Sequence, residues 1–190
     1  MSKTEKLSLW TCQGKGYSII KDNLDPALSG YNKAVPSYRD NRKKLSEEKI
    51  GTPNFIWCCI QNNKHNDKCW EADKPVKWFL EVPINEVLSI VDTFIWNRII
   101  GDHEYPRNKL FGKALKAINE SQNKSQIDLD ALKKLYQDQY EESLPKSENE
   151  MWDRLIIPKN SWNDILKEEF AWESYTVLIP HPAKESWVIF

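Results

Sequence analysis

The sequence has no long apolar run and no large excess of charge of either sign. Its longest apolar-leaning stretch, residues 87–100, is interrupted by polar and charged side chains and is too short to cross a bilayer. No apolar segment follows the first lysines, so we expect no secretory signal and a cytoplasmic protein. The formal net charge is −1 over 190 residues, and two glutamates closely follow the basic run at residues 39–44. A general nucleic-acid surface is therefore not expected, because phosphate binding needs a basic excess on one face.

The sequence also lacks a C-x-x-C pair among its four cysteines. Cys58 and Cys59 are adjacent, so in a strand they would point to opposite faces and could not bind one metal ion together. A zinc site from Cys58, His65 and Cys69 would still lack a fourth ligand. We therefore expect no metal site, and buried free thiols in a reducing compartment.

Several sequence signatures of common enzymes are missing as well. There is no G-x-G-x-x-G, P-loop, G-x-S-x-G or H-E-x-x-H pattern. Their absence excludes the enzyme classes that are easiest to recognise, and whether the chain is an enzyme stays open.

Tryptophan, in contrast, is abundant: the chain has nine Trp beside seven Tyr and six Phe. Aromatic side chains bury large areas, so they could fill a bulky core or line a cleft for a planar ligand. A bulky core is the default interpretation.

Residues 54–61 form the most clearly buried strand. The segment is aromatic, β-branched and uncharged, and it follows a turn signal at residues 51–53. Alternation divides it into a face where a cleft could open and a face that should be core under helices. The first face carries Phe55, Trp57, Cys59 and Gln61, and the second carries Ile56, Cys58 and Ile60.

The remaining pattern predicts an α+β fold with a mainly antiparallel central sheet flanked by irregular helices. Further strands are predicted at residues 7–12, 76–83, 175–179 and 187–190, with 76–83 paired to 54–61. Helices are predicted at 37–49, 93–100, 109–119 and 129–140, and shorter ones near 147 and 161, whereas 84–92 fits a helix or a strand. Asp128 and Ser147 have the residue types and positions of helix N-caps.

We expect residues 1–190 to form a single domain. Residues 109–145 are predicted to be a peripheral helical insertion, because neither of their helices has an apolar face broad enough to build a core.

Three segments resemble an uncharacterised bacterial domain family of unknown function. They are Leu-Trp-Thr-Cys-Gln at residues 9–13, Phe-Ile-Trp at 55–57 followed by Trp-Phe-Leu-Glu-Val-Pro at 78–83, and Ser-Trp-Asn-Asp-Ile at 161–165. The resemblance covers most of the chain, but its motifs are short and aromatic and carry no catalytic residue.

A weaker resemblance is to the ADP-ribosyltransferase-like fold, which opens with a strand bearing a polar residue and closes with a strand preceded by a glutamate. Gln13 and Glu173 occupy those places here. The resemblance implies NAD or another nucleotide bound beside the first and central strands. Glu173 would be catalytic and stabilise positive charge at the anomeric carbon, Gln13 and Tyr17 would orient the cofactor, and Trp57 or Trp78 would stack on the nicotinamide.

Each of these residues also has a plainer interpretation. Glu173 fits a surface carboxylate at the start of a strand, and Gln13 fits a turn residue. Residues 102–107 contain two acids, His103 and Arg107, which could form an acid/base cluster or a solvated connection.

Two functions from different classes therefore remain. One is an ADP-ribosyltransferase-like NAD- or nucleotide-binding protein that acts on an unknown target. The alternative is a non-catalytic protein-interaction factor, for example a phage or mobile-element inhibitor of a host protein, and it predicts an exposed apolar patch. Nucleic-acid binding through residues 39–44 with Tyr31 and Tyr38 ranks last.

Overall fold

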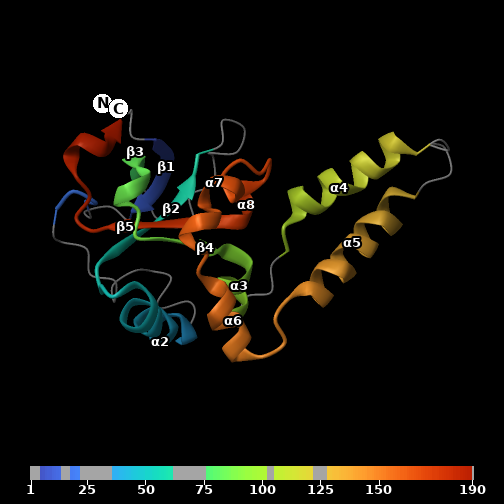
Figure 1. Cartoon of the computed structure of the whole chain (residues 1–190), viewed down its shortest axis with the longest axis horizontal. Helices are drawn as coiled ribbons and strands as arrows, with labels where there is room; N and C mark the ends of the chain where they lie inside the picture. The colour runs from blue at the N-terminus through green and yellow to red at the C-terminus, as the bar shows by residue number, and fades with distance from the viewer. Residues whose placement is uncertain are drawn as a thin grey trace.

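The computed structural model describes residues 5–13, 18–21, 36–61, 76–101, 105–121 and 128–189. It has one six-stranded sheet in the order β4-β5-β2-β1-β3-β6, and every pairing is antiparallel. Helices pack around this sheet, and one pair of helices projects from it (Figure 1). The predicted α+β class with a mainly antiparallel sheet is confirmed.

The strands lie close to their predicted positions. They are β1 (Lys6–Gln13), β2 (Phe55–Ile60), β3 (Val76–Pro83), β4 (Ser89–Asp92), β5 (Tyr175–Pro180) and β6 (Val188–Ile189). The predicted central strand, β2, lies between β5 and β1.

The predicted pairing of β3 with β2 is wrong. β3 pairs with β1 along its whole length, from Lys6 opposite Pro83 to Gln13 opposite Val76. These are the two longest strands, and pairing them forms a longer ladder than the six-residue β2 could offer.

The two faces of the sheet carry two separate core clusters. Leu9, Ile56 and Leu80 belong to the first cluster, together with Cys58 and Val177. Phe55 and Leu178 belong to the second, and Trp57 packs against it. The predicted division of β2 into two faces is confirmed at these positions, but the face expected to open a cleft is packed core at Phe55, which is almost fully buried.

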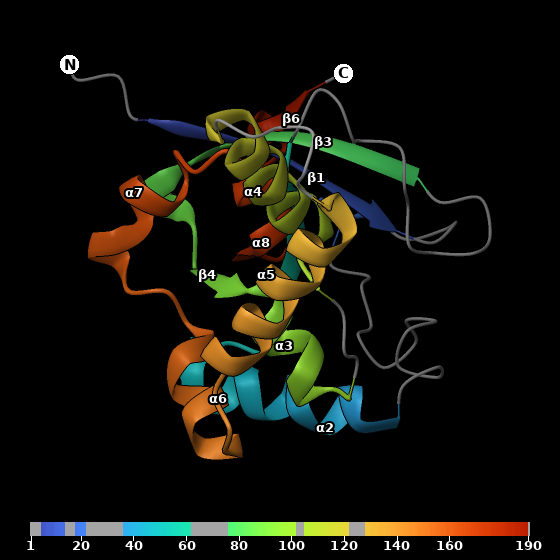
Figure 2. The same cartoon turned by 90° about the vertical axis from the view of Figure 1, so that its right-hand side faces the viewer.

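Three helices cover the face that carries Phe55. α2 (Pro36–Lys44) continues as the π-helix η2 (Leu45–Ile50), and it lies with α3 (Thr93–Ile99) and α6 (Glu148–Leu155) on one side of the sheet (Figures 1 and 2). η2 ends at Gly51, whose φ of 78° is in the left-handed region that favours glycine.

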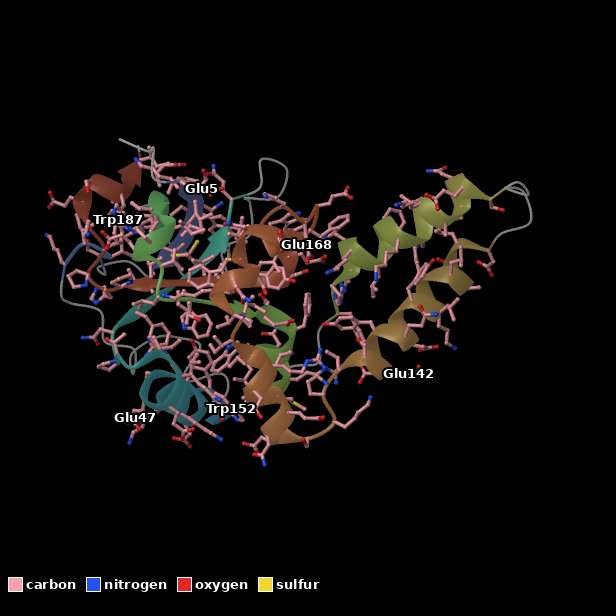
Figure 3. The ribbon with its side chains drawn as sticks, in the orientation of Figure 1. Glu5, Glu47, Glu142, Trp152, Glu168 and Trp187 are labelled. Atoms are coloured by element: carbon pink, nitrogen blue, oxygen red, sulfur yellow. The ribbon has the colours of Figure 1, made fainter. Side chains whose placement is uncertain are left out.

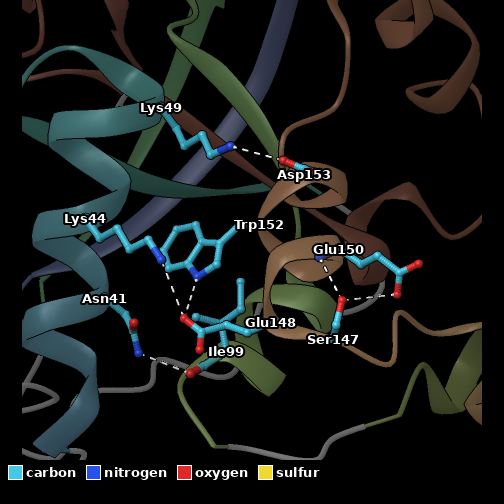
Figure 4. Close-up of polar contacts among 9 residues, drawn as sticks. All are labelled: Asn41, Lys44, Lys49, Ile99, Ser147, Glu148, Glu150, Trp152 and Asp153. Carbon is cyan, nitrogen blue, oxygen red and sulfur yellow. Dashed lines mark hydrogen bonds and ion pairs between the residues drawn. The ribbon is translucent and has the colours of Figure 1, made fainter.

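One carboxylate oxygen joins α2 to α6 (Figure 4). Oε1 of Glu148 accepts a hydrogen bond from Trp152 Nε1 at 3.2 Å and from Lys44 Nζ at 3.5 Å, and Lys44 also lies over the Trp152 ring. Lys49 pairs with Asp153 at 3.7 Å. The buried indole is thereby satisfied at its polar atom while its ring fills the core.

The opposite face is covered by short elements that bring tryptophans to the core. Trp162 opens α7 (Trp162–Ile165), which follows the 3-10 turn η5 (Lys159–Ser161), and Trp187 ends the 3-10 turn η6 (Glu185–Trp187). Both are buried in the first cluster, and Trp162 Nε1 donates to the carbonyl of Ile157 at 2.9 Å. Trp10, Trp96 and Trp152 are buried too, so core packing accounts for much of the high tryptophan content.

Residues 84–92, which fitted a helix or a strand, contain the 3-10 turn η3 (Ile84–Glu86) followed by β4.

Both predicted N-caps are confirmed: Asp128 accepts from the amides of Asp130 and Ala131, and Ser147 accepts from the amide of Glu150. Local side-chain chemistry was sufficient to locate these helix starts.

A helical hairpin projects from the sheet. It consists of α4 (Arg107–Glu120) and α5 (Leu129–Ser143), which pack side by side and extend away from the other elements (Figures 1 and 2). α8 (Ala171–Ser174) lies between the sheet and the start of α4. None of the described residues of α4 belongs to either core cluster. The hairpin occupies most of the residues 109–145 for which a peripheral helical insertion is predicted.

No helix within the described ranges is both long enough and apolar enough to cross a membrane.

Candidate functional site

Glu173, the predicted catalytic residue, lies in α8 and caps the start of α4. One of its carboxylate oxygens accepts from the backbone amide of Asn108 at 2.9 Å and from the Asn108 side-chain amide at 3.1 Å. The other accepts from the backbone amide of Lys109 at 2.9 Å. Pro106, the residue before α4, has no side-chain acceptor for these amides. Glu173 supplies the missing cap, and its negative charge is favourable at a helix N-terminus.

A second acid, Glu168, lies beside the same helix start (Figure 3). It pairs with Lys109 Nζ at 3.2 Å and accepts from the Tyr175 hydroxyl at 3.3 Å. Burial raises the pKa of Tyr175, and the charge of Glu168 raises it further. Tyr175 is therefore a neutral donor at physiological pH and cannot act as a ready base.

Asp92 lies opposite Tyr175 in the register of β4 and β5. It is the N-cap of α3, where Oδ1 accepts from the backbone amides of Phe94 and Ile95, each at 2.9 Å. Burial raises the pKa of Asp92, although both hydrogen bonds and the charges of Lys109 and Arg154 oppose the shift.

The end of α5 contacts α3 through aromatic and charged side chains. The Tyr140 ring packs edge-on against Phe94, with centroids 6.0 Å apart, and against Tyr105. Arg98 donates to a carboxylate oxygen of Glu141. Burial raises the pKa of Tyr140, and the charge of Asp92 raises it further.

We call the residues Asp92, Lys109, Tyr140, Glu168, Glu173 and Tyr175 the junction. Both oxygens of Glu173 and of Glu168, and Oδ1 of Asp92, accept hydrogen bonds or an ion pair from this chain. These contacts join the sheet, α3, α8 and the hairpin. The arrangement is suited to positioning the hairpin, and the groups that Glu173 would use on a substrate are engaged by α4.

The predicted cofactor-stacking residues lie on opposite faces of the sheet. Trp57 packs on Trp96, with ring centroids 5.0 Å apart, in the second core cluster. Trp78 packs against the first cluster. The indole N–H of each is buried without an acceptor among the described residues. Because the sheet lies between them, one ligand cannot contact both.

The strand register also separates Gln13 from Glu173. Trp10, Cys59 and Thr176 share one row across β1, β2 and β5. β1 and β5 run in the same direction, since both are antiparallel to β2, so Gln13 lies three residues beyond this row and Glu173 three residues before it. At about 3.3 Å per strand residue, Gln13 lies roughly 10 Å beyond this row, whereas Glu173 lies on the other side of it, in α8 before β5 begins at Tyr175. Tyr17 and residues 102–104, with His103, lie outside the described residues.

Cysteines form no joint site in the described ranges. Cys58 is buried in the first core cluster, and its neighbour Cys59 points to the other face; both are free thiols. No group of three metal-binding side chains occurs within the described ranges. Cys12 is disulfide-bonded, which corrects the expectation of a free thiol there. Disulfides are typical of oxidising compartments, so the cytoplasmic location stays a prediction.

The hairpin carries most of the exposed large apolar side chains that the structure describes. Phe111, Leu115 and Leu135 are 41%, 38% and 48% exposed, and the others are Val76 and Ile189. The sequence of α4 indicates this exposure. Its apolar residues at 110, 111, 114, 115 and 118 cover more of the helix circumference than packing against one neighbouring helix can bury.

No protein-family model, no curated protein and no solved structure matches the chain. This agrees with the resemblance to an uncharacterised family. The resemblance to the ADP-ribosyltransferase-like fold is not confirmed.

Proposed function

We propose that the chain is a non-catalytic protein-interaction factor that binds a protein partner on the α4–α5 hairpin. The observation that carries this proposal is the concentration of exposed apolar side chains on a projecting element: Phe111, Leu115 and Leu135 belong to the hairpin. Exposed apolar groups gathered on one element are characteristic of interaction surfaces, whereas scattered single ones are not.

Phe111 and Leu115 supply the centre of this surface. They are four residues apart in α4, so they lie on one helix face in successive turns. The ammonium group of Lys133 in α5 lies 5.0 Å from the centroid of the Phe111 ring. An amphipathic partner element could cover both apolar side chains together with the aliphatic part of the Lys133 side chain.

The charge of α4 indicates the chemistry of the partner. The helix carries four basic side chains and one acid. Lys109 is paired with Glu168, but Arg107 and Lys113 are exposed and form no ion pair with any residue in the described ranges. A partner that is apolar at its centre and acidic at its rim would complement this helix.

The test is affinity capture by the purified chain from cells that produce it, followed by mass spectrometry. We expect Phe111→Ser with Leu115→Ser to lose the captured partner, because burying the two side chains supplies much of the binding energy. The matched control is Val76→Ser with Ile189→Ser, which removes exposed apolar side chains outside the hairpin and should leave capture unchanged. Equal capture by both double variants would contradict the proposal.

A thermal-shift measurement with nucleotides tests the alternative, enzymatic function. At a hundredfold its dissociation constant, a ligand stabilises the folded state by about 2.7 kcal/mol. We expect no thermal shift with NAD or ADP-ribose, and a clear shift abolished by Glu173→Gln would favour the ADP-ribosyltransferase-like function instead.

A further inference from the structure

The two ends of the hairpin are attached to the sheet layer in different ways. At the end of α5, Tyr140 packs against the second core cluster, and Leu144, the residue after α5, is buried within it. At the start of α4, Glu173 caps the helix, Lys109 pairs with Glu168, and Gly112 contacts Phe170. Leu110 is buried there, but no described residue of α4 belongs to either core cluster. The α5 end is therefore anchored in a core cluster and the α4 end is not.

The contact between Gly112 and Phe170 is unusually close. A Cβ atom built at Gly112 would lie 2.8 Å from Cζ and 3.0 Å from Cε2 of the Phe170 ring. Only a residue without a side chain lets the ring lie against the helix backbone at this distance. Phe170 precedes α8, three residues before Glu173, so both contacts come from one short segment of the chain.

We propose that Glu173 and Phe170 form a latch that holds the α4–α5 hairpin at one angle to the sheet. When the latch opens, the hairpin moves as one body about the anchored end of α5. The hairpin can remain folded during this motion because α4 and α5 pack along each other and α4 shares no residue with either core cluster. The latch controls the orientation of the surface that is proposed to bind a partner. It rests on that proposed function in this respect, but it is testable without any partner.

Amide hydrogen exchange tests whether the hairpin stays folded when the latch is opened. In Glu173→Ala, the amides of Asn108 and Lys109 lose their acceptor, and we expect their exchange to rise roughly 5- to 30-fold, as loss of a helix cap implies. Amides in the middle of α4 and α5 should keep their protection, because the hairpin stays folded. NMR hydrogen exchange on the full chain measures both.

A distance measurement tests the motion itself. Spin labels at Glu120→Cys, at the end of α4, and Glu47→Cys, in η2, are both at exposed positions. We expect one narrow distance distribution in the otherwise unchanged chain and a broad or shifted one in Glu173→Ala. Gly112→Ala opens the same latch from its other side, so it should broaden the distribution as well. Free Cys58 and Cys59 are controlled by labelling the chain without the added cysteines.

The matched control is Glu142→Ala, which removes an exposed acid of α5 that lies outside the junction. It should change neither the distance nor the exchange. Loss of protection throughout α4 in Glu173→Ala would show that the helix unfolds instead of moving as one body, and would overturn the proposal. So would an unchanged distance distribution in both latch variants. Neither result would bear on partner capture, so failure of the latch and failure of the docking proposal are distinguishable.

Discussion

At the residue scale, carboxylates in this chain have roles that depend on which amides their neighbours leave unsatisfied. In the sequence, Glu173 is the acid that precedes a closing strand, and this position suggested a catalytic residue. Its oxygens instead accept from the first amides of α4, since Pro106 offers them no acceptor. Asp92 and Asp128 do the same for α3 and α5 within their own segments. The local cap at Asp128 was predicted from the sequence, but the non-local cap at Glu173 was not.

Asp92 makes stability depend on pH in a predictable direction. Burial raises its pKa above the ordinary value of 3.8, so the folded state binds the proton more tightly than the unfolded state. As pH rises from below 3.8 through the raised pKa, the folded state loses stability from this group. In Asp92→Asn the amide oxygen can accept the same bonds without a charge. We therefore expect the free energy of unfolding of the native chain, minus that of Asp92→Asn, to fall across this window in urea titrations.

Asp128→Asn is the control for that measurement. Asp128 accepts two backbone amides like Asp92 but is exposed. Its substitution removes a charged cap from an exposed position, so it separates the effect of losing the charge of a cap from the effect of burial. A difference between native chain and Asp92→Asn that stays flat with pH would contradict the prediction.

At the element scale, the hairpin is defined by where its helices fail to contribute to the core. α5 has no fully buried residue, and α4 buries Leu110 and Ala114 without joining either core cluster. β5, in contrast, buries three consecutive residues, Val177–Ile179, because both faces of the central sheet are covered. The central strand and the hairpin should therefore respond very differently to truncation.

Ile179→Ala and Leu135→Ala test that contrast. Ile179 is fully buried, and its truncation should lower the free energy of unfolding by about 2 to 5 kcal/mol. Leu135 is 48% exposed, and its truncation should cost about 0.5 kcal/mol or less. Guanidinium unfolding measures both, and a cost at Leu135 near that at Ile179 would show that the hairpin face is buried.

Gly112 and Phe170 should be coupled. In the native background Gly112→Ala should destabilise the chain, because its Cβ would meet the Phe170 ring at 2.8 Å. In a Phe170→Ala background the ring is gone and alanine is the better helix former, so the same substitution should stabilise by up to about 1 kcal/mol. Equal effects in both backgrounds, measured by urea unfolding, would refute the coupling.

At the scale of the whole molecule, helices and short elements cover both faces of one antiparallel sheet, and the two core clusters lie on either side of it. This arrangement buries the adjacent cysteines of β2 on opposite faces. Burial raises the pKa of Cys58 well above its ordinary value and that of Cys59 to about 11. Neither is a reactive thiolate at neutral pH.

The thiols should therefore report unfolding of the whole molecule. At pH 8 we expect both to resist alkylation in the native chain and to react promptly in denaturant. Under native conditions Cys59, which is less buried, should be modified before Cys58. Peptide mass spectrometry after timed iodoacetamide treatment separates the two. Rapid modification of Cys58 in the folded chain would contradict its burial.

The sequence by itself determined the elements whose signals are local. Alternation located β1 and β3, an uncharged aromatic and β-branched run located β2, and a strand-like run located β5. Side-chain acceptors at Asp128 and Ser147 located two helix starts. All these signals depend on residues a few positions apart. The division of β2 into two faces followed from the same alternation.

Only the tertiary structure decided which strands pair and which side chains meet. Nothing near residues 54–61 indicates that β1 lies between β2 and β3, because strand order depends on the total length of ladder and on burial over the whole sheet. The same holds for Glu173, whose partners in α4 precede it by about 65 positions, and for Trp57 and Trp78, which the sheet separates. Contacts between distant segments are selected by packing of the complete chain, so the candidate NAD site could be assembled from residue types and yet not be brought together in space.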